Sequence, residues 1–133
     1  MQGSENRVRK QYHLRKSAVG FDAWDVDRLI KLSKELPVLP VPLESIAEID
    51  ENYWFQGGGE EQPVCRSVIA HARLINDADL AFPILLCAEG RVMDGMHRVA
   101  KALLQEAKSI LAIRFLETPA PDYIGIDPNT LPY

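Results

Sequence analysis

The pattern of apolar and polar residues predicts a mixture of helices and short strands. Apolar residues that recur every three or four positions indicate amphipathic helices, whereas short apolar runs bounded by glycine, proline or polar residues indicate strands. The first half of the chain predicts a helix from a cap at Asp22 or Asp25 to Leu36, then an extended edge segment over 37–43 with three prolines, and then one helical turn over 43–47. The second half predicts a helix over 64–79, a β-hairpin over 84–93, a helix over 96–107 and a strand over 110–116. This order predicts an α/β (α+β) protein with a small mixed sheet and packed helices.

The helix over 64–79 has the clearest apolar periodicity. Val64, Val68, Ala72 and Ile75 follow one another at intervals of four, four and three residues, which places them on one face. We expect this face to pack against the core.

Three stretches lie outside these elements. Residues 1–17 are polar and predict a lead-in arm, with a mobile arm favoured over an edge strand, ahead of a single domain over 18–133. The acidic, aromatic and glycine-rich residues 50–63 predict a lid or substrate loop, with a plain surface insertion as the alternative. The residues after Pro119 predict a turn-rich tail over the surface.

Composition narrows the classes of protein that fit. The chain has 133 residues, 47% of them hydrophobic and 26% charged, and can bury a core without disulfide or metal. Cys65 and Cys87 show no zinc-binding spacing and fit a reducing compartment, and no apolar run is long enough to cross a membrane. These features predict a soluble cytoplasmic protein. The net charge of −4 disfavours duplex DNA as a partner, because phosphate contacts need a basic surface.

The segment Asp94-Gly95-Met96-His97-Arg98 lies where the predicted hairpin meets the following helix. The first amides of a helix have no internal partner and favour an anion, and a glycine lets a phosphate approach. His97 and Arg98 oppose the helix dipole unless an anion is bound, so we expect both side chains to converge on a phosphate. In the alternative interpretation, Asp94 caps the helix and the other two are ordinary surface residues.

The order of elements and the pattern Gly-x-x-x-Asp-Gly-x-His-Arg at 90–98 resemble the ParB/sulfiredoxin superfamily. The matching stretches, within a core of 38–116, are Val38 to Ile46, Cys65 to Ile75, Pro83 to Cys87, Gly90 to Leu104 and Ile110 to Leu116. The resemblance implies that the amino end of the helix, with His97 and Arg98, holds nucleotide phosphates. Sulfiredoxins carry a reacting cysteine where this chain has Met96, which cannot form a thiolate, so sulfinic-acid repair is excluded there.

The Asp-Gly-x-His-Arg form also resembles that of free-serine kinases in this superfamily. That likeness implies phosphoryl transfer from a nucleotide (ATP, ADP or CTP), with Mg²⁺ as a further candidate cofactor, to a small hydroxyl-bearing acceptor. The implied roles are a phosphate clamp by the Gly95 and Met96 amides with His97 and Arg98, a metal ligand or cap at Asp94, and a base at Glu48 or Asp50, with His97 as a further catalytic candidate. Solvated surface carboxylates are the alternative for Glu48 and Asp50.

Other residues have two interpretations at this level. Tyr53 and Trp54 stack on a base or anchor the core. Arg66 makes a second phosphate contact or, more simply, a surface salt bridge, and His71 is structural rather than catalytic.

Three functions follow from these features. The first is a ParB-like nucleotide- or phosphate-binding domain that works as a phosphotransferase or nucleotidase. The second is a non-catalytic nucleotide-sensing or protein-interaction module. The third, disfavoured by the charge, is a ParB-like nucleic-acid accessory. The nucleotide, the acceptor and the oligomeric state stay open.

Overall fold

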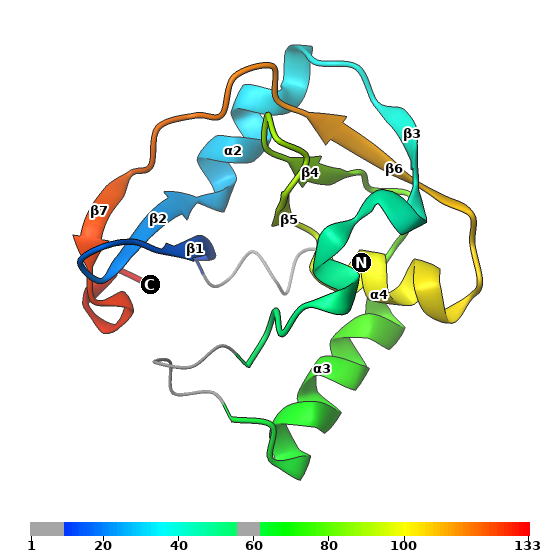
Figure 1. Ribbon diagram of the computed structural model, residues 1–133, viewed down its shortest axis with the longest axis horizontal. Coiled ribbons are helices and arrows are strands. Elements are labelled where there is room, and N and C mark those ends of the chain that lie inside the picture. Colours follow the sequence, from blue (N-terminus) through cyan, green and yellow to red (C-terminus); the bar gives the residue numbers. More distant parts are fainter. Residues whose placement is uncertain (1–9, 56–61) are drawn as a thin grey trace.

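Two small β-sheets form the framework of the protein, which is seen here in a computed structural model that describes residues 10–55 and 62–133 (Figure 1). The strand orders are β3-β6-β4-β5 in one sheet and β1-β2-β7 in the other. The strands are β1 (Tyr12–Lys16), β2 (Phe21–Asp25), β3 (Leu39–Pro42), β4 (Ile84–Leu86), β5 (Val92–Asp94), β6 (Ser109–Arg114) and β7 (Tyr123–Ile126). The described residues form three α-helices, α2 (Val26–Leu32), α3 (Cys65–Asp77) and α4 (Met96–Leu104), and four 3₁₀ turns, η1 (Ser33–Glu35), η2 (Leu43–Ser45), η3 (Ala47–Asp50) and η4 (Pro128–Thr130). The mixed α+β class is as predicted.

The four-stranded sheet is mixed and carries the main core. Strand β4 runs parallel to β6 and antiparallel to β5, and β3 pairs antiparallel with β6. All three residues of β4 are buried, because both faces of this central strand are covered. One face packs against α4 and the turn after β3 through Leu43, Ile46, Ile84, Leu86, Val92, Met96, Val99, Ala102, Ile110 and Ala112. The other face packs against β2 and α2 through Trp24, Leu29, Leu85, Cys87, Met93, Ile113 and Phe115.

Several predicted elements are confirmed. The hairpin of β4 and β5, helix α4 and strand β6 lie where the apolar pattern places them, and the proline-rich segment forms the edge strand β3. Asp25 caps α2 by accepting a hydrogen bond from the Asp27 amide at 2.9 Å, so the alternative cap at Asp22 is wrong. Helix α2 ends at Leu32, and η1 completes the stretch that was predicted to be helical up to Leu36.

The three-stranded sheet was not predicted. Residues 12–16 of the predicted arm form its edge strand β1, and residues 123–126 of the predicted tail form β7, which pairs with β2 about a hundred residues earlier in the chain. Strands β1 and β2 are neighbours in the chain and pair as a hairpin, whereas β7 joins them from a distant segment. Each strand is short, so the sheet depends on all three pairing together.

Helix α3 is rotated relative to the prediction. Its half-buried residues are Ser67, His71 and Ile75, and within α3 no residue is fully buried. Val64 is 56% exposed and Val68 is 49% exposed, so most of the predicted core face points to solvent. The expectation that this face packs against the core is wrong.

Among the described residues, no helix is long and apolar enough to cross a membrane.

Candidate functional site

The predicted strand-to-helix junction is present, but Gly95 rather than Asp94 caps the helix. Strand β5 ends at Asp94, α4 begins at Met96, and Gly95 between them has φ = 106°. No side chain donates or accepts at this cap, so the interpretation of Asp94 as a helix cap is wrong. Met96 is buried in the core beneath the helix.

Arg98 turns back over Gly95 instead of forward from the helix. Its Nη2 lies 3.0 Å from Asp94 Oδ2, and its Nη1 donates to the carbonyl oxygens of Phe82 and Pro83 at 3.2 and 3.1 Å. A Cβ at position 95 would lie 2.8 Å from Arg98 Nη2. The space that the glycine leaves is therefore filled by the guanidinium group. Burial raises the pKa of Asp94, and the neighbouring Arg98 opposes that shift.

His97 turns to a different partner, on α3. Its Nε2 lies 2.8 Å from His71 Nδ1, so the two imidazoles share a hydrogen bond. Both rings stack beneath Trp54, with ring centroids 4.5 Å (His71) and 4.8 Å (His97) from the indole. Burial lowers the pKa of His97 to about 4, with His71 and Arg98 adding to the effect. The sequence predicted that His97 and Arg98 converge on one phosphate. In the structure the two side chains bind different partners, so this prediction is wrong.

The loop aromatics serve the core and this stack. Tyr53 and Trp54 both pack against the core on the α4 side of the sheet, and Tyr53 meets Trp54 edge-on at 6.3 Å. Of the two interpretations given to these residues, the structure places both as anchors, and one face of the Trp54 indole is occupied by the two histidines.

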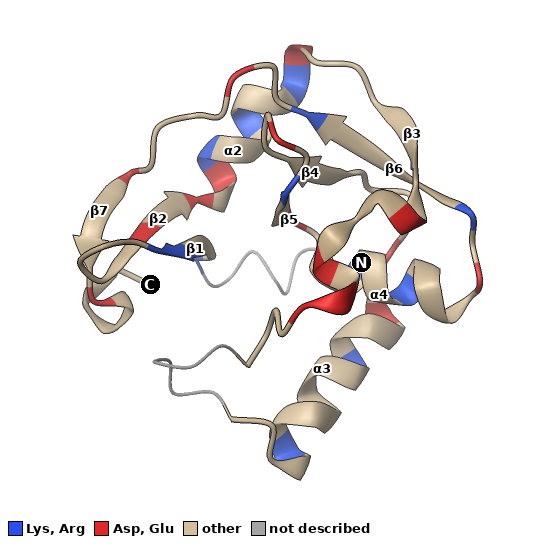
Figure 2. Cartoon of the chain, viewed as in Figure 1, with Lys and Arg blue, Asp and Glu red and all other residues tan. Residues whose placement is uncertain are grey.

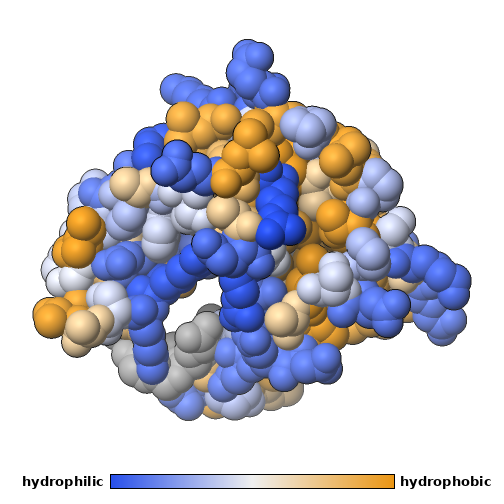
Figure 3. Space-filling model, turned by 45° about the horizontal axis from the view of Figure 1, so that its top comes forward, coloured by the Kyte–Doolittle hydropathy of each residue, from blue (hydrophilic) through white to orange (hydrophobic). Residues whose placement is uncertain are grey.

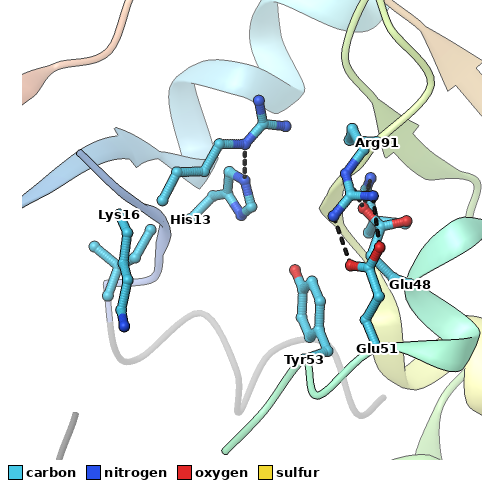
Figure 4. A pocket seen from close by; sticks show the side chains of 9 residues that line it. His13, Lys16, Glu48, Glu51, Tyr53 and Arg91 are labelled. Carbon is cyan, nitrogen blue, oxygen red and sulfur yellow. Dashed lines mark hydrogen bonds and ion pairs between the residues drawn. The ribbon is translucent and has the colours of Figure 1, made fainter. Parts of the chain in front are cut away.

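A polar cavity of about 230 Å³ lies beside the junction, between the edge strands of the two sheets. We call it the β1–β5 cavity. It is lined by His13, Leu14, Arg15, Lys16, Glu48, Glu51, Tyr53, Arg91 and Val92. Figure 4 shows His13 and Lys16 from β1 on one side of the space, facing Tyr53, Glu48, Glu51 and Arg91 on the other. In the space-filling view, the surface has an opening with a mostly hydrophilic rim (Figure 3).

On the β5 side of this cavity, one arginine binds two carboxylates. Arg91 donates from Nη1 and Nη2 to the two Glu51 oxygens at 2.9 and 2.6 Å, and its Nε lies 3.2 Å from Glu48 Oε2. Glu48 is only 2% exposed, and its Oε2 also accepts from the Val92 amide at 2.8 Å. The other oxygen of Glu48, Oε1, is buried and has no hydrogen-bond partner among the described residues. This side carries two carboxylates against one guanidinium.

The β1 side of the cavity carries cations that form no ion pair with a carboxylate among residues 10–55 and 62–133. Arg15 donates from Nε to His13 Nε2 at 2.9 Å and lies over the Trp24 ring at 5.3 Å. Its Nη2 is buried without a hydrogen-bond partner in the described part of the chain. Burial lowers the pKa of His13 to about 3, with Arg15 contributing, so this histidine is a neutral acceptor. Lys16 is exposed at the end of the strand. The cavity is thus polarised from a cationic side to a carboxylate side.

Tyr53 lies between the β1–β5 cavity and Asp94 at the strand-to-helix junction. Burial raises its pKa to about 12, and the carboxylates of Glu48 and Asp94 act in the same direction, so both lie close to the phenol. Val92 and Asp94 also share one face of β5, because alternate residues of a strand point the same way.

The structure brings only part of the predicted set together. Glu48 and Tyr53 line the β1–β5 cavity, whereas Asp50 is exposed on η3 and Arg66 is exposed on α3, outside the lining. The polar lining residues that were not predicted from the sequence are His13, Arg15, Lys16, Glu51 and Arg91. Three of them, His13, Arg15 and Lys16, belong to a run of basic residues over 7–16 of the sequence, but they reach the cavity only because residues 12–16 form strand β1.

Asp94 was also predicted to be a metal ligand. Asp94 is paired with Arg98, and the described residues contain no group of three or more His, Cys, Asp or Glu side chains that could hold a metal ion.

Comparison of the chain with models of protein families, with curated proteins and with solved structures gave no match. The resemblance to the ParB/sulfiredoxin superfamily therefore stays a prediction from the sequence.

Proposed function

We propose that the chain is a ParB/sulfiredoxin-like domain that binds a small phosphorylated ligand of the mononucleotide class in the β1–β5 cavity. One observation carries the proposal: Glu48 and Arg15 both line the cavity, and each has a buried polar atom, the acceptor Oε1 and the donor Nη2, without a hydrogen-bond partner among the described residues. A buried polar atom left unpaired costs about 1–3 kcal/mol, so a ligand that satisfies both atoms gains affinity.

The polarity of the cavity supports a ligand with a phosphate at one end and hydroxyl groups at the other. Arg15 and Lys16 would bind the phosphate, since guanidinium and ammonium groups make charge-assisted hydrogen bonds of about 1.5–3 kcal/mol each. Glu48 would accept from hydroxyl groups, as acidic residues do from ribose in nucleotide-binding proteins. A ribose phosphate presents both ends.

The volume limits how much of the ligand the cavity encloses. About 230 Å³ is below the roughly 300–1,000 Å³ of sites that enclose a drug-sized ligand. We therefore assign the sugar and phosphate to the cavity and place the base outside it.

Phosphoryl transfer is a second candidate function, and the geometry of Glu48 favours it. Its Oε2 is held by the Val92 amide and Arg91, whereas Oε1 has no hydrogen-bond partner among the described residues, as a general base for a ligand hydroxyl requires. In that reaction a small acceptor takes the place of the ribose beside Glu48, its hydroxyl oxygen attacks the terminal phosphorus of ATP, its proton passes to Glu48, and ADP leaves. Without turnover, the same cavity would serve a nucleotide-sensing module.

Isothermal titration calorimetry with ATP, ADP, CTP, ribose 5-phosphate and inorganic phosphate tests the binding. We expect Arg15→Gln and Glu48→Gln to weaken binding at least about tenfold, the equivalent of 1.4 kcal/mol, and the distant surface variant Lys34→Ala to leave it unchanged. Formation of ADP that stops in Glu48→Gln would separate the enzyme from the sensing module.

The proposal fails if none of these compounds binds. Binding of free serine, with the same sensitivity to both variants, would show that the cavity holds an amino-acid zwitterion instead. Retention of duplex DNA that depends on the basic residues near the amino terminus would support the nucleic-acid accessory. Arg98→Ala would not test ligand binding, because the Arg98 guanidinium donates to Asp94 and to the carbonyl oxygens of Phe82 and Pro83 within the chain.

A further inference from the structure

Helix α3 presents its apolar side to solvent. Val64, Val68 and Ile69 are 56%, 49% and 51% exposed, and Ala72 on the same side is also exposed. These four residues form a stripe along the helix, which we call the α3 stripe. A helix normally buries its apolar side, so this arrangement leaves a surface that is suited to a partner.

The protein holds α3 through polar contacts instead. His71 shares a hydrogen bond with His97 of α4, and Lys101 of α4 donates to the carbonyl oxygens of Asn76 and Ala78 at 2.9 and 2.7 Å. In Figure 1, α3 extends away from both sheets and lies next to α4. The polar side of the helix is therefore used for attachment, and no described element packs over the apolar side, whose Val64, Val68 and Ile69 are exposed.

Two arginines border the α3 stripe. Arg66 precedes Ile69 by three residues and Arg73 follows it by four, so both lie beside Ile69 on the helix surface. Both are exposed, and neither makes an ion pair or hydrogen bond within the described residues. Figure 2 shows blue segments on α3, whose basic residues are these two arginines. The edge of the stripe is thus cationic in a chain whose net charge is −4.

We propose that the α3 stripe docks an acidic amphipathic helix of a partner protein. Apolar side chains of the partner would cover Val64, Val68, Ile69 and Ala72, and its carboxylates would pair with Arg66 and Arg73. Charge complementarity sets the class of partner, since two unpaired cations beside an apolar surface attract an acidic segment.

The same residues argue against two other occupants. In an antiparallel pair of α3 helices from two copies of the chain, Arg66 would face Arg73 of the other copy, and like charges repel. Helices that lie on membranes are rich in lysine and arginine and carry Trp, Phe or Leu, whereas this stripe has valine, isoleucine and alanine.

Fluorescence anisotropy with a labelled amphipathic peptide tests the proposal. The probe has leucine at the heptad a and d positions and glutamate elsewhere, and a control peptide has lysine in place of glutamate. We expect the wild-type protein to bind the glutamate peptide and to prefer it over the lysine peptide. Arg66→Glu/Arg73→Glu should weaken binding of the glutamate peptide at least about tenfold and reverse the preference.

A matched control is Lys31→Glu/Lys34→Glu, which makes the same charge change on exposed lysines of α2 and η1 and should leave binding unchanged. All these side chains are exposed, so thermal unfolding should be similar in every variant. Failure of the wild type to bind the glutamate peptide, or equal weakening in the control, would overturn the proposal. So would binding to phosphatidylserine vesicles without peptide binding, or a dimer in sedimentation velocity that Val68→Glu abolishes.

Discussion

Arg98 joins three parts of the chain, because its guanidinium group reaches from α4 to Asp94 on β5 and to the carbonyl oxygens of Phe82 and Pro83 ahead of β4. The pair with Asp94 is well shielded, with side chains 17% and 21% exposed. Replacing Arg98 leaves a shielded carboxylate and two carbonyl groups without this partner.

We expect Arg98→Ala to lower the free energy of unfolding by about 2–3 kcal/mol, since removal of one member of a buried pair is strongly destabilising. Arg28→Ala is the control, because the Arg28–Asp122 pair is more exposed and should contribute only about 0.5–1 kcal/mol. Urea denaturation measures both. Equal losses in the two variants would show that Arg98 has no special structural role.

Gly95 and Glu106 are a matched pair of positions with positive φ, at 106° and 59°. Gly95→Ala should lower the free energy of unfolding by about 1–2 kcal/mol from φ alone. The loss should be larger in practice, because a Cβ at position 95 would lie 2.7 Å from Ile84 Cγ2. Glu106→Gly, just beyond the end of α4, should raise stability by about 0.5–1 kcal/mol. Thermal or urea unfolding that shows the same sign for both would contradict this account.

At the scale of elements, α3 and α4 meet through the stack of His71, His97 and Trp54. Hydrogen bonding between two imidazoles needs one ring to accept, so at least one of the two must be neutral. The contact between these helices therefore depends on the protonation of a histidine, which links the packing of two elements to pH.

The pKa values of His97 and His13, about 4 and about 3, lie below the ordinary value of 6.5. As the pH falls below about 6.5, the unfolded chain binds protons that the folded chain does not, so the free energy of unfolding decreases. The loss of stability that His97 causes is complete near pH 4, and the loss that His13 causes is complete near pH 3. Urea denaturation at about pH 7.5 and about pH 5 should show this loss, and His97→Gln should reduce it. An unchanged pH dependence in the variant would contradict the assignment.

At the scale of the whole molecule, stability is unevenly distributed. The two core clusters cover both faces of the four-stranded sheet, whereas α3 contributes no fully buried residue. Amides of β4 and α4 should therefore exchange only on global unfolding, and amides of α3 should exchange at a lower free energy. Hydrogen exchange followed by mass spectrometry measures this order. Protection of α3 equal to that of α4 would show that its outer side is covered in solution.

The local elements of the four-stranded sheet could be predicted because their signals are local. Prolines at 40 and 42 indicate an edge strand, the Glu89-Gly90 pair marks the hairpin turn, and Asp25 marks a helix start. Strand β1 lacks such a signal because its residues are mostly polar, although its partner β2 follows directly in the chain. Strand β7 lacks one because its partner β2 lies about a hundred residues earlier.

Part of the candidate site could also be predicted from local sequence, and part of it could not. Residue types alone indicated an unusual junction at 94–98 and an acidic residue at Glu48, and both lie near the β1–β5 cavity. The direction of Arg98 and the pairing of His97 with His71 could not be predicted, because each depends on a segment brought close only by folding.

The amino-acid sequence by itself thus determined the mixed α+β class, the hairpin and the junction at Gly95, because periodicity, turn residues and backbone freedom act over a few neighbouring positions. Tertiary structure alone decided which side of α3 is buried, and it decided that Arg15 and Glu48 line one cavity. The physical reason is that burial and charge compensation depend on what lies opposite a side chain in space, and the neighbours in the sequence do not specify it.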